Sequence, residues 1–242
     1  MSPFVAEGQL IVSVAKGIEE NTLMTLSEII MEEIPQCEVA VLCGPSHAEE
    51  VSRGMPTSVV VASGDANLAI LAQQTFFTDR FRVYTSSDII GVELAGALKN
   101  VIGVGAGICD GLGFGDNAKS ALLTRGLVEM ARFGVAYGAE HSTFYGLAGM
   151  GDLITTCISP HGRNRRVGYR LGKGERLSDI LGSTPMVAEG VTTARSVWER
   201  TRQMGLDMPV MTAVYRVLYE GKSPFEAVEE LMSRQPRAER SH

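Results

Sequence analysis

The chain has 242 residues, of which 45% are hydrophobic and 21% are charged, so it is long enough to bury a full core. These values exclude a disordered tail, a collagen-like chain and a disulfide-stabilised mini-protein. The 22 lysines and arginines against 28 aspartates and glutamates give a net charge of −6, which argues against a general nucleic-acid-binding face.

The first part of the chain alternates between short apolar runs and amphipathic segments. The apolar runs predict strands at residues 9–15, 37–43, 57–62 and 80–84. The amphipathic segments predict helices at residues 22–34, 46–53 and 67–77. Such alternation indicates crossover connections and a mostly parallel sheet that is covered on both faces.

The second part of the chain has only helical periodicity. After about residue 87 no run resembles a strand, and a helix is expected from Asp116 or Asn117 to Tyr137, ended by Gly138. The predicted fold class is therefore α/β in residues 1–87 followed by all-α in residues 88–242.

The apolar runs, the first residues, the cysteines and the histidines indicate where the protein is located and whether it binds a metal. No stretch reaches the ~18 apolar residues that a membrane span needs, and the first residues lack the basic and apolar regions of a signal peptide. The four cysteines form no CxxC pair and predict buried free thiols in a reducing compartment. The four histidines lack the close pairing that a zinc centre usually needs.

Lys99 and Asn100 interrupt an otherwise apolar, glycine-rich helical run. One interpretation is that Lys99 is exposed on the surface. The other is that the neighbouring Leu98 and Val101 place its ammonium in a poorly hydrated environment. Desolvation lowers the pKa of a lysine, which would make Lys99 a usable general base near neutral pH.

A second motif, GMGDL, surrounds Asp152. This aspartate could simply cap the helix that follows it. Asp152 and Thr156 are also four residues apart, so they would share one helix face and offer a carboxylate and a hydroxyl to the same ligand.

A third motif is a basic run that begins at Gly162 and Arg163. A solvated helix face is one explanation of such a run. The other is an anion site, in which the helix N-terminus, Arg163 and Asn164 together bind a phosphate. Lys16 and Gly44 each follow a predicted strand, where open sheets place ligands, although either could belong to a plain turn.

The glycine-rich fingerprint of dinucleotide-binding folds, GxGxxG, is absent from the sequence. The glycines at 103, 105 and 107 and those at 111, 113 and 115 have the wrong spacing and follow helical sequence. Much of the excess among the 27 glycines therefore lies at 91–115 and 146–151, around the Lys99 and Asp152 motifs, rather than in a dinucleotide loop.

These motifs together resemble the bacterial-type NAD(P)-dependent glycerol-3-phosphate dehydrogenases. The matching blocks are AKGIE at 15–19, GPSHAEE at 44–50, FRVYTSSDIIGVELAGALKNV at 81–101, GICDGLGFGDNAKSALLTRGLVEM at 107–130, GLAGMGDLITTC at 146–157, RNRR at 163–166 and AEGVTTA at 188–194. The resemblance implies that residues 1–87 are the C-terminal portion of a Rossmann-type cofactor domain with a parallel sheet. It also implies that residues 88–242 are an all-helical substrate-binding and catalytic domain.

The family's functional positions can be carried over onto this sequence. The resemblance makes Lys99 the proton acceptor. The implied substrate-binding positions are Lys16, Gly44, Ser46, Lys99, Asn100, Asp152, Thr156, Gly162, Arg163 and Asn164. The implied cofactor-binding positions are Lys16, Ala48, Arg163, Val187 and Glu189. Gly162 departs from the family, which usually has a serine there, so one hydroxyl contact is lost.

The implied reaction is hydride exchange between NADH or NADPH and dihydroxyacetone phosphate, giving sn-glycerol 3-phosphate for phospholipid synthesis. A cytoplasmic homodimer that binds neither nucleic acid nor membrane is expected.

In the family a βαβ unit with the glycine fingerprint precedes the AKGIE strand, and here it is not found. The alternative is therefore a truncated, catalytically weak module that binds phosphate or self-associates. The choice between NAD and NADP stays open.

Overall fold

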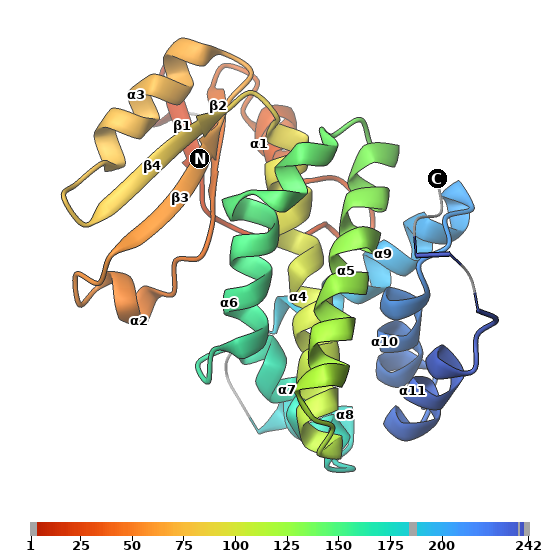
Figure 1. Ribbon diagram of the computed structural model, residues 1–242. Helices are drawn as coiled ribbons and strands as arrows, with labels where there is room; N and C mark the ends of the chain where they lie inside the picture. The colour runs from red at the N-terminus through yellow and green to blue at the C-terminus, as the bar shows by residue number, and fades with distance from the viewer. Residues whose placement is uncertain (1–3, 184–187, 237, 240–242) are drawn as a thin grey trace.

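The computed structural model describes residues 4–183, 188–236 and 238–239, which form a small α/β part and a larger helical part (Figure 1). The elements of the α/β part are β1 (Leu10–Ser13), α1 (Leu26–Glu33), β2 (Glu38–Cys43), α2 (Ala48–Val51), β3 (Thr57–Ala62), α3 (Ala66–Phe76) and β4 (Phe81–Ser86). All four strands lie within two residues of the predicted runs. Helix α1 begins later than expected, because Thr25 and Glu28 form a capping box that starts it.

The sheet is mixed rather than fully parallel. Its strand order is β1-β2-β3-β4, with β1–β2 and β3–β4 parallel and β2–β3 antiparallel. The prediction of a mostly parallel sheet therefore holds for the two outer pairs and is wrong for the central one. The connection between β2 and β3 contains only the short helix α2, which does not carry the chain back along the sheet for a parallel crossover.

The two faces of the sheet belong to different cores. On the face that packs on α3, sheet residues form a small core of their own with Ala72 of that helix; the sheet residues are Ala40, Leu42, Val59, Val61 and Val83. The alternate residues Val41, Cys43 and Ala62 join the main core of the helical part. The sheet thus packs between α3 and the helices that carry most of the predicted site.

The helical part contains no strand among its described residues, as predicted. Its elements are α4 (Ile89–Leu112), α5 (Asp116–Ala136), η2 (His141–Tyr145), η3 (Leu147–Gly151), α6 (Asp152–Ile158), α7 (Arg163–Gly172), α8 (Leu177–Gly182), α9 (Glu189–Met204), α10 (Pro209–Tyr219) and α11 (Pro224–Met232). Helix α5 lies where predicted, but Gly115 caps it instead of Asp116 or Asn117. Gly138 follows its end with a φ of +89°, a conformation that favours glycine.

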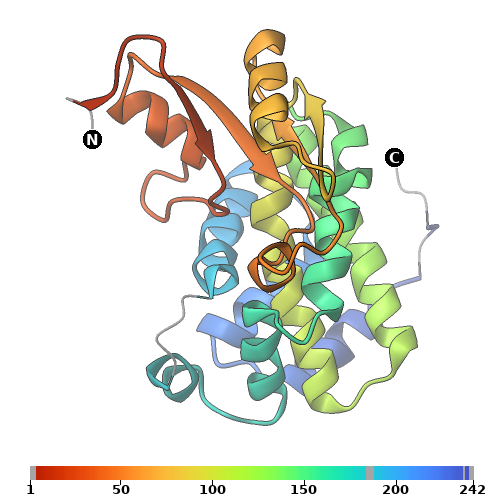
Figure 2. The ribbon, with the colours of Figure 1, turned by 90° about the vertical axis from the view of Figure 1, so that its left-hand side faces the viewer.

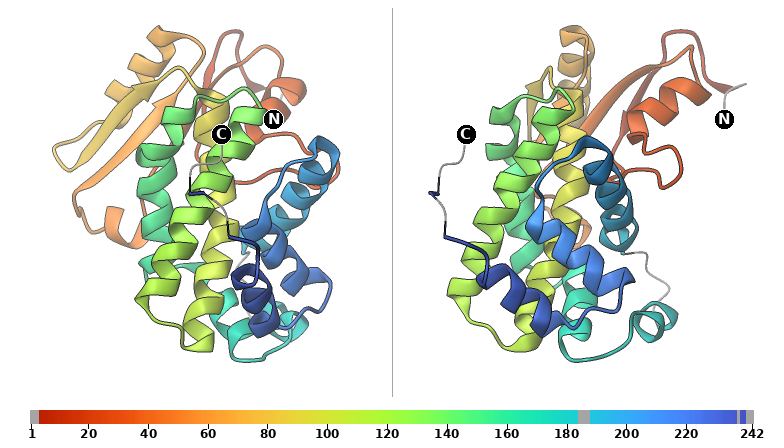
Figure 3. Two further views of the ribbon diagram at one scale, coloured as in Figure 1. Left: turned by 45° about the vertical axis from the view of Figure 1, so that its right-hand side comes forward. Right: turned by 90° about the vertical axis from the view of Figure 1, so that its right-hand side faces the viewer.

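Helix α4 is the centre of the molecule. The sheet packs on one side of it, and α9 and α10 lie on the other (Figures 2 and 3). At 24 residues α4 is long and apolar enough to cross a membrane, so the expectation that no stretch reaches that length is wrong. However, 89% of its most apolar window is buried within the protein, and a core helix surrounded on all sides is apolar all round.

Glycines let α4 and α7 touch backbone to backbone. A Cβ atom at Gly107 would overlap the carbonyl oxygen of Arg165, and one at Gly168 would overlap the carbonyl oxygen of Val104. No other residue type fits these two positions without moving a helix. These two glycines therefore serve this crossing, which fixes α7 relative to Lys99 on α4.

Glu129 ties α5 to the start of α10. Its side chain is 3% exposed and accepts hydrogen bonds from the backbone N–H groups of Val210 at 2.8 Å and Met211 at 3.0 Å. Burial raises the pKa of Glu129 to about 7, although the two N–H groups oppose the shift. The carboxyl group is therefore protonated at mildly acidic pH in the folded chain and already ionised in the unfolded chain.

This difference predicts a pH-dependent stability. Between the unfolded value of 4.5 and about 7 only the folded chain holds the proton. The free energy of unfolding should therefore fall by about 3 kcal/mol as the pH rises through this window. The Glu129→Gln variant should lack this component, so its stability relative to the wild type should rise from about pH 5 to about pH 8 in urea unfolding. A constant difference between the two proteins would contradict the assignment.

Candidate active site

A cleft of about 640 Å³ opens where the carboxyl ends of β1 and β2 meet α4, α6 and α7. The predicted site residues that line it are Lys16, Ser46, Ala48, Lys99, Asn100, Asp152, Thr156, Gly162, Arg163, Asn164 and Glu189. Gly44 lies beside the cleft, and its carbonyl oxygen accepts a hydrogen bond from Lys16 Nζ at 3.3 Å. Val187, a predicted cofactor contact, lies outside the described residues.

Two lysines share one buried carboxylate at the base of the cleft. Lys16 Nζ lies 2.7 Å from Asp152 Oδ2, and Lys99 Nζ lies 3.0 Å from Asp152 Oδ1. Lys99 also donates a hydrogen bond to the hydroxyl of Thr156. These side chains come from the loop after β1, from α4 and from α6, so the three segments meet at this carboxylate.

Asp152 is not a helix cap. Gly151 occupies the cap position of α6, after the single π-helical turn η3. Asp152 is the first residue of α6, and its carboxylate points to the two lysines instead of to the backbone N–H groups. The interpretation as a cap is therefore wrong, while the shared face of Asp152 and Thr156 is confirmed by their common partner Lys99.

Lys99 is buried, with 6% of its surface exposed, so the interpretation as a surface lysine is wrong. Burial lowers the pKa of Lys99, and the Lys16 ammonium acts in the same direction, while Asp152 opposes both. A lysine with a lowered pKa can lose and regain its proton closer to neutral pH. The position therefore fits proton transfer with a ligand in the cleft.

Lys16 differs from Lys99 although it pairs with the same carboxylate. Burial alone would lower its pKa, but nearby negative charge raises it overall. Asp152 is the effective anion, because burial raises the pKa of the Cys43 thiol to about 11 and keeps it neutral at physiological pH. Lys16 therefore keeps its charge, and the two lysines can take different roles.

The other end of the cleft is polar and lies at the start of α7. Asn164 is fixed on both sides, because its amide donates to Asn100 Oδ1 at 2.9 Å and accepts from the N–H of Gly190 at 2.9 Å. Asn100 also donates to Glu189 at 3.3 Å. Arg163 is held more loosely, half-exposed and 3.8 Å from Glu189. With Gly162 as cap, the free N–H groups of α7 and these side chains can bind an anion.

Three other members of the basic run have partners within the protein. Arg165 pairs with Asp110 of α4 at 2.7 Å, and Arg170 pairs with Glu175. The ammonium of Lys173 lies 5.5 Å from the ring centre of Tyr169. Arg165 and Arg170 thus have partners within the protein, and the predicted anion site at Gly162, Arg163 and Asn164 stays a prediction.

Sequence reasoning missed several residues around the cleft. Cys43 donates a weak hydrogen bond to Asp152 Oδ2 at 3.6 Å, while His47, Glu49, Phe81 and His161 line the cleft. The position of Cys43 at the carboxyl end of a strand was a usable signal, because Gly44 was singled out for that reason. All four cysteines are free, but Cys37 is only half-buried.

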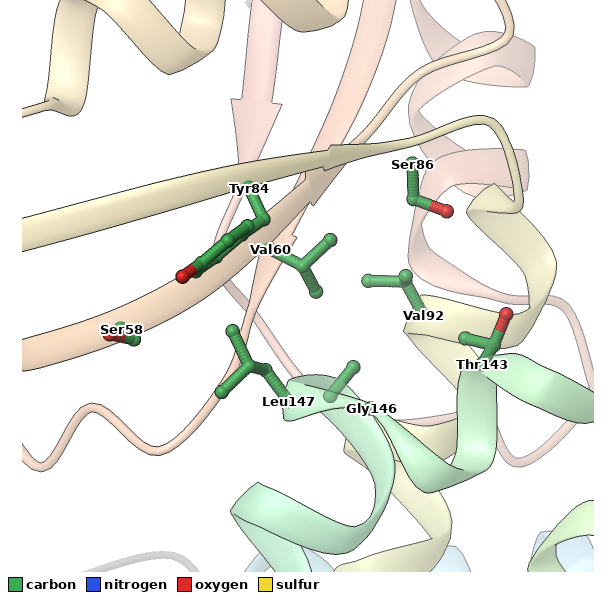
Figure 4. Close-up of a pocket in the computed structure, with 9 residues that line it drawn as sticks. Ser58, Val60, Tyr84, Ser86, Val92, Thr143, Gly146 and Leu147 are labelled. Carbon is green, nitrogen blue, oxygen red and sulfur yellow. The ribbon is translucent and has the colours of Figure 1, made fainter.

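A second cavity, of about 420 Å³, lies between the sheet and the segment η2–η3 (Figure 4). Figure 4 shows Val60 and Tyr84 of the sheet facing Leu147, with Ser86 and Thr143 at one end. Of the described residues that line it, Tyr84 alone has a titratable side chain. The cavity contains none of the predicted site residues, so the first cleft is the candidate active site.

The family models and two relatives that match this chain carry the name glycerol-3-phosphate dehydrogenase. The family model for the C-terminus of NAD-dependent glycerol-3-phosphate dehydrogenase matches residues 88–229, and the model for the N-terminus matches residues 1–69. A protein from Chlorobium chlorochromatii, named glycerol-3-phosphate dehydrogenase [NAD(P)+], is 52% identical over 97% of this chain and 71% of its own length. One of the same name from Geobacter metallireducens is 53% identical over 99% of this chain and 72% of its own.

Solved structures agree with the sequence relatives. Glycerol-3-phosphate dehydrogenase from Coxiella burnetii superimposes with a TM-score of 0.92 at 37% identity, covering 97% of this chain and 72% of that protein. Glycerol-3-phosphate dehydrogenase from Saccharomyces cerevisiae gives a TM-score of 0.81 at 29% identity, covering 90% and 66%.

Proposed function

Because the chain belongs to the NAD-dependent glycerol-3-phosphate dehydrogenase family, we propose that it interconverts dihydroxyacetone phosphate and sn-glycerol 3-phosphate with NAD(P)H. The observation that carries this proposal is the cleft with two lysines on one buried carboxylate at its base and an anion site at its end. A substrate with a phosphate at one end and a carbonyl or hydroxyl near the other matches both features.

The phosphate end of the substrate would bind at the start of α7. Arg163 would supply charge-assisted hydrogen bonds, and Asn164 and the first N–H groups of the helix would supply further donors. Binding energy gained there holds the reacting carbon in place, so that part of the barrier is overcome by positioning. Gly162 would contribute only its backbone, because it has no side-chain hydroxyl.

The reacting oxygen would lie at the lysine pair. In the oxidising direction Lys99 accepts the proton of the C2 hydroxyl, and in the reducing direction its ammonium returns a proton to the carbonyl oxygen. Lys16 keeps its charge and stabilises negative charge that develops on that oxygen. Asp152 and Thr156 hold the Lys99 amine in position, and Asn100 links this end of the cleft to Glu189.

The cleft also fits the nicotinamide end of a dinucleotide. Val14, Ala15 and Leu42 form an apolar wall at the carboxyl ends of β1 and β2, opposite polar groups of the helical part. Ala48, Arg163 and Glu189 would contact the cofactor there, together with Lys16. Val187, the remaining proposed contact, lies outside the described residues. When bound, the cofactor supplies or accepts the hydride.

Turnover tests the proposal directly. The folded chain should oxidise NADH or NADPH when dihydroxyacetone phosphate is added, and glycerone without the phosphate should be a poor substrate. Absence of phosphate-dependent turnover by the folded chain would overturn the proposal. Calorimetric titration then identifies the alternative, a module that binds glycerol 3-phosphate without catalysis.

Arg163 offers a test of the phosphate site. Arg163→Leu should raise the Kd for glycerol 3-phosphate about 10- to 100-fold, because a hydrogen bond to a charged group contributes roughly 1.5–3 kcal/mol. Titration calorimetry measures the change. Arg166→Leu is the matched control, since Arg166 is exposed on the same helix and does not line the cleft. Equal effects of both variants would contradict the assignment.

We further propose a metabolic role, a cellular compartment, a domain division and an oligomeric state for this enzyme. Glycerol 3-phosphate carries two free hydroxyls that can be acylated, which supports a role in phospholipid synthesis. The four free cysteines fit a reducing compartment such as the cytoplasm. The start of α4 at Ile89 supports the proposed division into a cofactor part, residues 1–87, and a substrate part, residues 88–242. We also propose a homodimer, which light scattering after size-exclusion chromatography would test.

A further inference from the structure

The loop between β1 and α1 carries Lys16 and has a fixed conformation. The Glu19 carboxylate accepts hydrogen bonds from the backbone N–H groups of Asn21 at 2.8 Å and Thr22 at 2.6 Å. Leu23 is buried with a φ of +61°, which is unusual for a residue other than glycine. A strained residue persists only where its surroundings determine it, so this loop is built to hold one shape.

A buried glutamate of α4 fastens the far end of this loop. Glu93 is 6% exposed and accepts hydrogen bonds from both the backbone N–H of Ser27, at 2.8 Å, and the Ser27 hydroxyl. Ser27 lies in the first turn of α1, where the loop ends, and is itself buried. Glu93 precedes Lys99 by fewer than two turns of the same helix.

The stem of Lys16 rests on the same stretch of α4. A Cβ atom at Gly96 would lie 3.5 Å from Cγ of Lys16, which is ordinary contact distance, so the lysine stem packs directly over this glycine, while the same Cβ would overlap Sγ of Cys43 at 2.8 Å. Helix α9 adds a second attachment, because the Ser196 hydroxyl donates to the carbonyl oxygen of Ile18 at 3.3 Å. The loop is thus attached to α4 through Ser27 and to α9 through Ile18. Lys16 lies between β1 and the Ile18 contact, and its ammonium reaches Asp152.

The carboxyl group of Glu93 takes no part in the chemistry proposed above. Burial raises its pKa, and the hydrogen bonds from Ser27 and Thr25 oppose that shift. It does not line the cleft. Burying a carboxylate costs free energy, so its presence here calls for a structural role. The hydrogen bonds that Glu93 accepts all come from the segment that follows Lys16 and ends in the first turn of α1.

We propose that Glu93 is a positioning residue for Lys16. By accepting hydrogen bonds from Ser27, Glu93 keeps the loop in the conformation that brings Lys16 Nζ to both Asp152 and the Gly44 carbonyl. The inference rests on the proposed function, because Lys16 acts there on the substrate. The position of Lys16 can nevertheless be measured without turnover.

Chemical labelling of Lys16 tests the position itself. The Glu93→Gln variant and the wild type are treated with acetic anhydride, and acetylation of each lysine is followed by mass spectrometry. In the Glu93→Gln variant Lys16 should move away from Asp152, so its pKa should fall and more of its amine should be unprotonated. A pKa lower by half a unit makes acetylation of Lys16 about threefold faster, and at least this increase is expected. Exposed Lys173 is the internal reference. Glu129→Gln is the matched control, since Glu129 is also a buried carboxylate that accepts two hydrogen bonds.

A double-mutant cycle tests the consequence for catalysis. Glu93→Gln should lower kcat/KM by about tenfold, as expected for a misplaced catalytic group, and should have no further effect in a Lys16→Met background. Unchanged Lys16 labelling, or the same loss of activity in both backgrounds, would overturn the proposal. If Glu93→Gln fails to fold, Ser27→Ala, which removes the hydroxyl donor alone, takes its place. If the wild type shows no turnover, the proposed function fails and the labelling still decides the role of Glu93.

Discussion

Lys99→Met should lower kcat in both directions by about 10²–10⁴-fold, the range expected for the loss of a general acid–base group. Methionine has a similar length and suits an apolar site, so the cleft should keep its shape. The KM for glycerol 3-phosphate should change far less, because the anion site at the start of α7 is intact. Initial-rate kinetics with each substrate measure both quantities.

The same substitution should not destabilise the fold. Removing Lys99 leaves Asp152 paired with Lys16 and removes a buried cation, whose burial is costly. Urea unfolding should therefore give a free energy of unfolding at least equal to that of the wild type. Lys173→Met, at an exposed lysine, is the control for activity. Full activity of a folded Lys99→Met variant would rule out proton transfer by this residue.

Asp152→Asn should have the largest effect on stability. Asp152 is the counter-charge of both lysines, and removing one partner of a buried ion pair typically costs 3–5 kcal/mol. Because Lys16 is partly exposed, the lower end is expected, about 3 kcal/mol. The variant should also lose activity, since neither lysine is then held in place.

A second substitution separates the charge effect from a packing effect. In the double variant Lys99→Met/Asp152→Asn the buried unpaired cation is gone, so much of the lost stability should return. Denaturant unfolding of the wild type, both single variants and the double variant gives the coupling directly. If the two losses simply add, or if Asp152→Asn is as stable as the wild type, the shared carboxylate does not balance the two lysines.

Much of this site could be predicted because its signals are local in sequence. The apolar residues Leu98 and Val101 near Lys99 favoured burial without excluding an exposed lysine, and the spacing of Asp152 and Thr156 predicts a common helix face. The same is true of Gly162 and Arg163 at a helix start. In the sheet, each strand follows from a short apolar run, so all four lie close to their predicted positions.

Other features depend on contacts between distant segments and have no local signal. Lys16 and Asp152 are 136 positions apart, and nothing near Asp152 distinguishes a helix cap from an ion pair until the segments meet. The antiparallel pairing of β2 with β3 depends on how far the short α2 connection reaches. The α4–α7 crossing was visible only as excess glycine, because its reason is the backbone of another helix.

The pH dependence of kcat for glycerol 3-phosphate oxidation tests most directly the central claim that Lys99 accepts the substrate proton. Substrate deuterated at C2 first verifies that the chemical step limits the rate. The rate should then rise with pH through an inflection below 10.5, the ordinary lysine value, because burial lowers the pKa of Lys99. A rate independent of pH, or the same inflection in the residual activity of Lys99→Met, would contradict the claim.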